Sequence, residues 1–190
     1  MKKCSVLGIV IAAVIYLLMF VLASSCGLIH PACYAYAGTF APLLFSFVYL
    51  YTAAAMQCFG AAVVLNGFVL IIGSTLGEGN PPMIIGLILL TLMAELVRKI
   101  IGYDTRKGVR GSFIPFAFSF YAYSAHWWTN TAESLAEAVE EMPAGYADTM
   151  AAVIRNKPVL VIMLMLTIPV AVFAMRMAEK VMKKQAARLK

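Results

Sequence analysis

The sequence predicts an all-α integral membrane protein, built as a bundle of six membrane-spanning helices. Of its 190 residues, 63% are hydrophobic and 13% are charged, whereas soluble domains carry about 25% charged residues. No formally charged residue occurs between Lys3 and Glu78. Because a membrane-spanning helix needs about 20 apolar residues, the chain has room for six such helices joined by short loops.

Six apolar runs separated by loops give the predicted crossings. They lie at about residues 5–24, 34–51, 58–75, 82–97, 112–129 and 158–177. Pro42 predicts a kink in the second crossing and Pro115 a break in the fifth, because proline removes a helical hydrogen bond. Asn66 in the third crossing predicts a hydrogen bond between helices. These segments together form a single predicted membrane domain.

The N-terminal run also has features of a secretory signal peptide. Lys2 and Lys3 precede it, and small residues and Cys26 follow it. The run is longer than the usual apolar region of a signal peptide, and five more hydrophobic segments follow. It is therefore interpreted as the first crossing.

One connection is long, the segment at residues 130–157 between the fifth and sixth crossings. Asn130 with Glu133 three positions later is typical of a helix start. Four apolar residues recur on one face of the expected helix, namely Leu135, Ala136, Val139 and Met142. The pattern predicts either an amphipathic helix lying on the bundle or a lid over a binding cavity.

The charge distribution orients the bundle. With six crossings, both termini lie on one side, together with the loop between the fourth and fifth crossings. That side holds most of the 15 basic residues, namely Lys2, Lys3, Arg98, Lys99, Arg106, Lys107, Arg110, Arg176, Lys180, Lys183, Lys184, Arg188 and Lys190. Because basic segments stay in the cytoplasm, both termini are predicted to be cytoplasmic. Topology thus explains the basic excess, and no nucleic-acid partner is expected.

No motif of a common enzyme class occurs, so no catalytic residue is assigned and no enzymatic activity is expected. The sequence has no G-x-S-x-G, H-E-x-x-H or Walker lysine motif. Secondary transporters usually show repeated halves and buried ionisable residues. The sequence shows no internal repeat and almost no charge inside its apolar runs. If the chain moves a solute, we therefore expect the energy to come from another subunit.

Glu95 is the one carboxylate at the inner boundary of the fourth crossing. It lies three and four residues before Arg98 and Lys99. This spacing predicts a local helical ion pair. The alternative is a docking contact for a partner on the cytoplasmic side.

Polar and aromatic residues that topology does not require gather on the predicted outer side. They are His30, Glu78, Asn80, Tyr123, His126, Trp127 and Trp128. Tryptophans are also typical of a membrane interface, and histidines of solvated loops. A carboxylate, imidazoles and aromatic faces are nevertheless what a small-ligand pocket uses. These seven residues are therefore the predicted substrate site.

Cys26, His30 and Cys33 are residue types that could also bind a metal ion. The spacing of the three residues matches no strong zinc pattern. A disulfide or free thiols are favoured, and no metal site is assigned.

Several features follow one another in a recognisable order along the whole chain. The turn Gly77-Glu78-Gly79 precedes the fourth crossing, and Ala94-Glu95-Leu96 ends it. An aromatic fifth crossing, the segment Gly145-Tyr146-Ala147-Asp148-Thr149-Met150 and a basic tail come next. In this order the chain resembles the substrate-binding S components of energy-coupling-factor (ECF) importers, and within them the branch called MptD or Trep_Strep.

The resemblance implies a six-helix S-component fold in a bacterial cell membrane that binds a micronutrient from outside. It implies as partners a membrane T component and two cytoplasmic ATPase subunits. The ATP would be used by those partners, so no cofactor is expected in this chain. The loop of Cys26, His30 and Cys33 departs from the family pattern, which leaves the ligand open and includes a metal chelate or a haem-like compound.

Small residues on the first helix contact the T component in that family. Gly8 and Ala12 match this pattern, with glycine in place of one of the usual alanines. Close approach of two helices in lipid requires such small side chains. Gly8, Ala12 and Glu95 are therefore the predicted partner interface.

Two other classes of function are compatible with the sequence. One is a non-transporting accessory or scaffold subunit of another membrane complex, and the other is a self-sufficient small transporter. Co-purification of ATPase subunits discriminates among the three.

Overall fold

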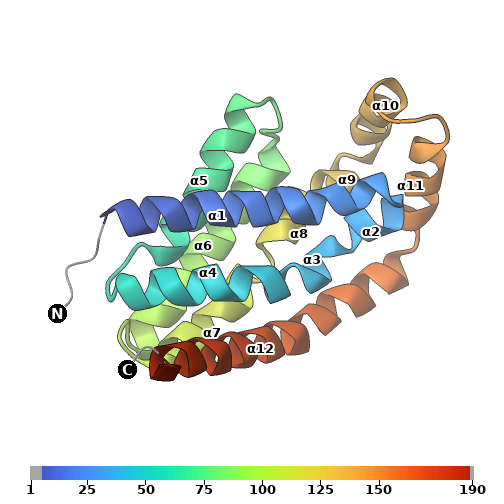
Figure 1. The fold of residues 1–190 in the computed structure, drawn as a ribbon. Coiled ribbons are helices and arrows are strands. Elements are labelled where there is room, and N and C mark those ends of the chain that lie inside the picture. The colour runs from blue at the N-terminus through green and yellow to red at the C-terminus, as the bar shows by residue number, and fades with distance from the viewer. Residues whose placement is uncertain (1–5, 189–190) are drawn as a thin grey trace.

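The computed structural model describes residues 6–188, and for residues 185–188 it describes the backbone alone. All regular structure in this range is helical (Figure 1). The helices are α1 (Val6–Ser24), η1 (Ser25–Leu28), α2 (Pro31–Ala35), α3 (Ala37–Phe40), α4 (Pro42–Ala55), α5 (Ala61–Thr75), α6 (Pro81–Ile101), α7 (Arg106–Phe116), α8 (Ser119–Tyr123), α9 (His126–Thr129), α10 (Thr131–Glu141), α11 (Tyr146–Arg155) and α12 (Lys157–Arg188). Lys2, Lys3 and Lys190 lie outside the described residues.

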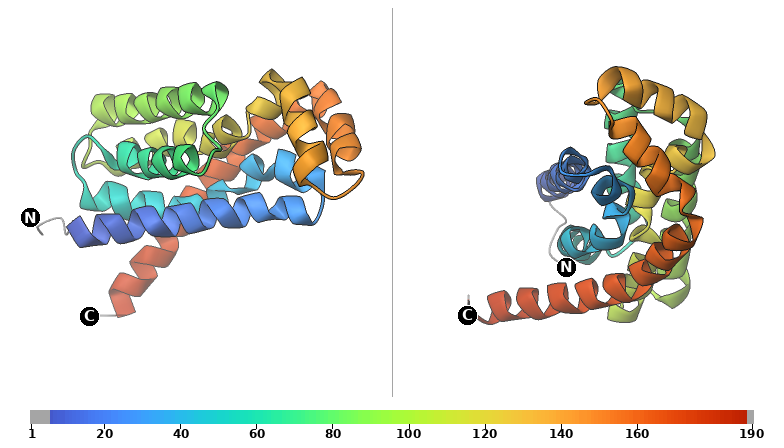
Figure 2. Two further views of the ribbon diagram at one scale, coloured as in Figure 1. Left: turned by 90° about the horizontal axis from the view of Figure 1, so that it is seen from above. Right: turned by 90° about the vertical axis from the view of Figure 1, so that its right-hand side faces the viewer.

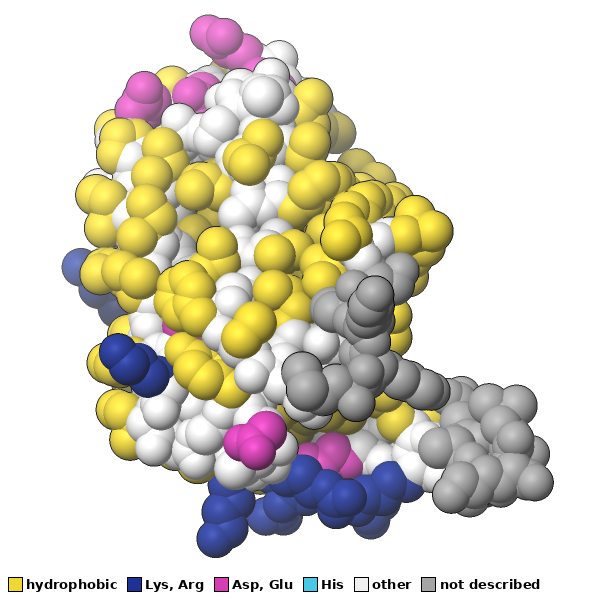
Figure 3. Space-filling view, turned by 90° about the vertical axis from the view of Figure 1, so that its left-hand side faces the viewer, with side chains coloured by type: hydrophobic (Ala, Val, Ile, Leu, Met, Phe, Trp, Pro, Cys, Tyr) yellow, Lys and Arg dark blue, Asp and Glu magenta, His cyan; other side chains and the backbone are white. Residues whose placement is uncertain are grey.

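The long helices run beside one another, with the chain ends together. α4 lies between α1 and α12 and packs on both (Figure 1). α6 packs on α5, α7 and α8. The start of α1 and the end of α12 lie at one end of the molecule, and α10 and α11 lie at the other (Figure 2). Lysine and arginine side chains gather along one edge of the face that Figure 3 shows. Placing both chain ends at one end agrees with an even number of passes through the bundle.

Helices occupy all six predicted crossings, but the second and the fifth are interrupted. Pro42 stands at the first position of α4, so it separates α4 from α3 where a kink inside one helix was predicted. α7 ends at Phe116, directly after Pro115, which confirms the predicted break. Among the described residues, two helical stretches are long and apolar enough to cross a membrane, Val6–Leu28 and Lys157–Lys184. The six-crossing count therefore stays a prediction.

One apolar core joins α1, α4, α5, α6, α7, α8 and α12. The buried face of α1 repeats at four-residue spacing through Ala12, Tyr16 and Phe20, as expected for one side of a helix. The Tyr16 ring packs on Phe45 and Phe116, with centroids 4.9 and 5.4 Å away. Aromatic pairs at such distances add to the energy of apolar burial.

Asn66 joins three helices within this core. The Tyr16 hydroxyl donates a hydrogen bond to Asn66 Oδ1 at 3.0 Å. Asn66 Nδ2 in turn donates to Thr91 Oγ1 at 2.9 Å. The three side chains belong to α1, α5 and α6, so the predicted interhelical hydrogen bond is confirmed.

The predicted ion pair between Glu95 and Arg98 or Lys99 is wrong. Glu95 is buried, and its Oε1 accepts a hydrogen bond from the backbone N–H of Ala62 at 2.8 Å. Arg98 is also buried, and its Nη2 donates to the carbonyl oxygen of Ala53 at 3.0 Å. Backbone groups at the start of α5 and at the end of α4 therefore bind the side chains of Glu95 and Arg98. Among the described residues the salt bridge lies elsewhere, between α7 and α12, where Arg110 Nη2 is 2.5 Å from Glu179 Oε2.

α10 buries a different face from the predicted one. The helix begins after Asn130 as predicted, although the Asn130 side chain bonds the Glu133 carboxylate and does not cap the backbone. Ser134 and Ala138 are buried, whereas Val139, which the apolar pattern placed inside, is 71% exposed. The reason is that α10 packs on α9 and α11 through its small residues.

Candidate functional site

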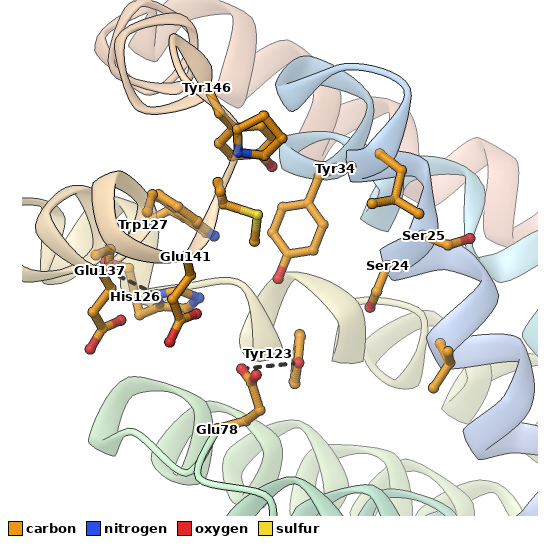
Figure 4. Close-up of a pocket in the computed structure, with 17 residues that line it drawn as sticks. Ser24, Ser25, Tyr34, Glu78, Tyr123, His126, Trp127, Glu137, Glu141 and Tyr146 are labelled. Atoms are coloured by element: carbon orange, nitrogen blue, oxygen red, sulfur yellow. Dashed lines mark hydrogen bonds between the residues drawn. The ribbon is translucent and has the colours of Figure 1, made fainter.

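A cavity of about 410 Å³ opens at the end of the molecule that carries α10 and α11 (Figure 4). Its walls come from the end of α1, from η1, α2, α8 and α9, and from the turn before α6. α10, α11 and the loop between them close one side. Small-molecule sites usually measure about 300–1,000 Å³, so this cavity has the size of a solute site. α10 and α11 thus cover part of this cavity, and a lid over a binding cavity, one of the two alternatives for residues 130–157, stays a prediction.

Four of the seven predicted substrate residues line this cavity, namely Glu78, Tyr123, His126 and Trp127. The Tyr123 hydroxyl donates to Glu78 Oε2 at 3.4 Å, across the interface between α8 and the turn before α6. His126 Nδ1 and Ser134 Oγ are hydrogen-bonded at 2.8 Å. His126 therefore attaches α10 to α9 as well as facing the cavity.

The other three predicted residues lie outside the cavity, and two of them cap helices. His30 Nδ1 accepts from the backbone N–H of Ala32 at 3.0 Å and caps α2. Asn80 Oδ1 accepts from the backbone N–H of Met83 at 2.9 Å and caps α6. Such caps satisfy backbone donors that a helix start leaves without partners. Trp128 lines a separate cavity between α10, α11 and α12.

Several lining residues were not predicted from the sequence. They include Glu137, Glu141, Tyr34 and Tyr146. Glu137 and Glu141 stand four positions apart on α10, so they share one side of the helix, and that side faces the cavity. The apolar pattern of residues 135–142 places these glutamates on the face opposite the apolar one, so no feature of the sequence indicated that they line a cavity.

Tyr34 connects the cavity wall to the core of the bundle. Its ring lies 5.9 Å from that of Phe120, which belongs to the core, with an edge-on orientation. On its other side the ring lies 6.3 Å from that of Trp127. Trp127 belongs to a second apolar cluster under α10 and α11, together with Met150 and Ile154. Tyr34 therefore packs in both clusters.

α11 approaches η1 closely at Gly27. An ideal Cβ built on Gly27 would lie 3.3 Å from the Tyr146 hydroxyl oxygen and 3.2 Å from Tyr34 Cβ. A side chain at position 27 would thus press on both tyrosines. Burial raises the pKa of the Tyr146 phenol, so at neutral pH this group is a hydrogen-bond donor at the cavity wall.

The loop of Cys26, His30 and Cys33 contains two cysteines and a histidine that caps a helix. Cys26 and Cys33 are free thiols, one of the two interpretations favoured from the sequence. Within residues 6–184, whose side chains are described, no cluster of three His, Cys, Asp or Glu side chains could hold a metal ion. His30 makes its helix cap instead.

The predicted partner residues lie in two places. Gly8 and Ala12 line a groove of about 340 Å³ between α1 and α4, together with Phe47 and Tyr51. Ala12 is 3% exposed, because it shares the buried face of α1 with Tyr16. Glu95 lies inside the bundle. The role of these three residues in a partner contact stays a prediction.

One comparison with known proteins gives a match. A family model described as "Hypothetical bacterial integral membrane protein (Trep_Strep)" matches residues 5–188. No curated protein and no solved structure matches the chain.

Proposed function

We propose a transport role for this chain, which belongs to the Trep_Strep family of bacterial integral membrane proteins. In this proposal it is the substrate-binding S subunit of an ECF-type importer. It binds a small solute at the outer face of the membrane and passes it on with a T component and two cytoplasmic ATPase subunits. The cavity carries the proposal, because it opens at the end of the molecule opposite the two chain ends.

The distribution of charge supports the same orientation. Arg106, Lys107 and Lys183 are exposed at the end where α6 meets α7 and where α12 finishes. Basic residues of this kind stay on the cytoplasmic side. With six crossings, the cavity then faces outward, where it meets solute before any partner acts.

In this proposal the chain itself is not an enzyme and uses no cofactor. The ATPase subunits bind and hydrolyse the ATP, and the T component passes the resulting movement to this chain. The cavity of this chain determines only which solute is bound.

Purification of the tagged chain from its native host in a mild detergent tests the proposal. We expect one membrane protein and two ATPase subunits to co-purify with it. Capture of another complex without ATPase subunits would instead indicate an accessory or scaffold subunit. Solute uptake by liposomes that contain this chain alone would indicate a self-sufficient transporter.

Uptake by the intact complex tests the site. Alanine at Glu78, His126 or Trp127 should weaken uptake while the protein remains folded and inserted, because these side chains line the cavity. Alanine at Trp128, which lines a different cavity, serves as the matched aromatic control. Unchanged uptake in the three cavity variants would reject this cavity as the solute site.

A further inference from the structure

We propose that the solute of this cavity is a small organic cation that also carries a hydrogen-bond acceptor. This inference rests on the proposed function only in that the bound solute is taken to be the transported substrate. The binding preference itself is a property of this chain alone.

Three carboxylates line the cavity, and no basic side chain among the described residues opposes them. Glu137 and Glu141 line it from α10, and Glu78 lies on the facing wall beside Tyr123 (Figure 4). None of the three takes part in a salt bridge within the described part of the chain. No lysine or arginine among the described residues lines the cavity. An anionic solute would therefore meet repulsion from every charged group, and a cation would meet attraction.

The Trp127 side chain is a second and independent indication of a ligand. It is only 6% exposed, and its Nε1 has no hydrogen-bond partner among the described residues. In Figure 4 this nitrogen points toward Tyr34, at the wall of the cavity. A buried N–H group without an acceptor is unfavourable, and native proteins usually satisfy such groups. A ligand oxygen or ring nitrogen near Trp127 would supply the missing acceptor.

The remaining walls favour an organic cation over a metal ion. Tyr34, Tyr123, Trp127 and Tyr146 surround the space with aromatic rings, and the faces of such rings attract ammonium groups. Within the described side chains no cluster of three metal-ligating residues exists, so the three glutamates do not converge as ligands of one ion. A protonated amine attached to an apolar body fits both the charge and the walls.

Two probes of matched shape and opposite charge test the inference on the chain purified in detergent. They are 4-methoxyphenethylammonium and 3-(4-methoxyphenyl)propanoate, which share the ring and the ether oxygen. We expect the ammonium probe to bind about tenfold or more tightly than the carboxylate probe, with binding that weakens as salt rises. Equal binding of the two, tighter binding of the carboxylate, or no binding of either would overturn the inference.

Charge-neutral variants locate the effect. Each exposed carboxylate near a bound cation contributes about two- to fivefold in affinity, so Glu137→Gln with Glu141→Gln should weaken ammonium binding about tenfold. Glu140→Gln removes the same charge from α10 at a position outside the cavity and should leave affinity unchanged. The single variant Glu141→Gln covers the case in which the double variant does not fold. Equal effects of Glu140→Gln and Glu141→Gln would overturn the assignment to the cavity.

The tryptophan arm uses the same probe. Trp127→Phe keeps a ring but removes the N–H donor, and should weaken ammonium binding about fivefold, the equivalent of one ordinary hydrogen bond. Trp128→Phe is the control, since its Nε1 also has no partner among the described residues but lies outside this cavity. Equal affinities of the two variants would overturn the acceptor requirement.

The inference and the proposed function fail in different ways. Two measurements distinguish these failures. One is the presence of ATPase subunits in the native purification, and the other is probe binding by the purified chain. Cation preference without ATPase subunits would reject the importer and keep the ligand class. ATPase subunits without cation preference would reject the ligand class alone.

Discussion

Glu95 and Arg98 lie one turn apart on α6 and bind the facing ends of two other helices. Glu95 accepts from the backbone of Ala62 in the first turn of α5. Arg98 donates to the carbonyl oxygens of Ala53 and Met56 where α4 ends. A helix carries partial positive charge at its start and partial negative charge at its end. The two side chains therefore match both helix ends in sign and hold the α4–α5 turn against α6.

Replacement of Arg98 by methionine should destabilise the protein strongly. The change removes the donor that serves three backbone carbonyls, those of Ala53, Met56 and Tyr103. Hydrogen bonds to charged groups contribute about 1.5–3 kcal/mol each, so we expect a loss of about 3 kcal/mol or more. Thermal unfolding in detergent measures it. Lys99→Met is the control, because Lys99 is an exposed neighbour. Equal melting temperatures for the two variants would contradict a stabilising role for the Arg98 hydrogen bonds.

Gly38→Ala should also destabilise the protein. An ideal Cβ at Gly38 would lie 2.5 Å from Tyr121 Cδ2, and the Tyr121 hydroxyl is held by Thr39 at 2.6 Å. Because the ring cannot move freely, we expect a cost of about 1–3 kcal/mol, as in other overpacked cores. Gly67→Ala in α5 is the matched control, since nothing lies within 4 Å of its Cβ. Unfolding temperatures of both variants give the comparison, and a neutral Gly38→Ala would refute the tight contact.

Ser134→Ala should loosen α10 without unfolding the bundle. The variant removes the hydroxyl that is hydrogen-bonded to His126 Nδ1 and also donates to the His126 carbonyl oxygen, and these contacts join α10 to α9. One hydrogen bond contributes about 1 kcal/mol, so amide hydrogen exchange in α10 should accelerate about fivefold. Thr149→Ala is the control, because its hydroxyl bonds Gly145 within the α11 region. If exchange in α10 stays unchanged, another contact holds the lid.

Gly8→Leu should abolish co-purification with the proposed T component. Gly8 lines the groove between α1 and α4, and a leucine there would fill the space that a partner helix needs. Ala12 is a less suitable position for this test, because it is buried within the chain itself. Val10→Leu adds bulk to an exposed position of α1 and should leave the complex intact. Recovery of the T component with Gly8→Leu would reject this interface.

The sequence was sufficient to predict where the helices lie in the chain, but not which of their faces are buried. Long apolar runs and prolines place the helices and the Pro115 break, since both depend on local chemistry. The buried face of α10 depends on α9 and α11, so its apolar pattern was misleading, and Val139 lies outside while Ser134 lies inside. Glu95 similarly pairs with a backbone group 33 residues away in the chain, which no local spacing reveals.

Part of the candidate site was predictable from the side of the membrane on which its residues were expected. Glu78 and Trp127 were predicted because they lie on the predicted outer side and the topology does not require them. His30 and Asn80 met the same criterion, yet each caps a helix. Glu137 and Glu141 were missed because carboxylates on an amphipathic helix are usually solvated. Only the position of α10 over the cavity distinguishes them.

Tyr34 touches both apolar clusters, so the stability of the segment that contains α10 and α11 depends in part on the packing of the bundle. Truncations on its two sides, at Phe120 and at Trp127, remove neighbours of the same ring. Substitutions that share such a neighbour are in general not additive. A double-mutant cycle across Tyr34 therefore measures how strongly the proposed solute-binding part of the molecule is thermodynamically coupled to the helical bundle.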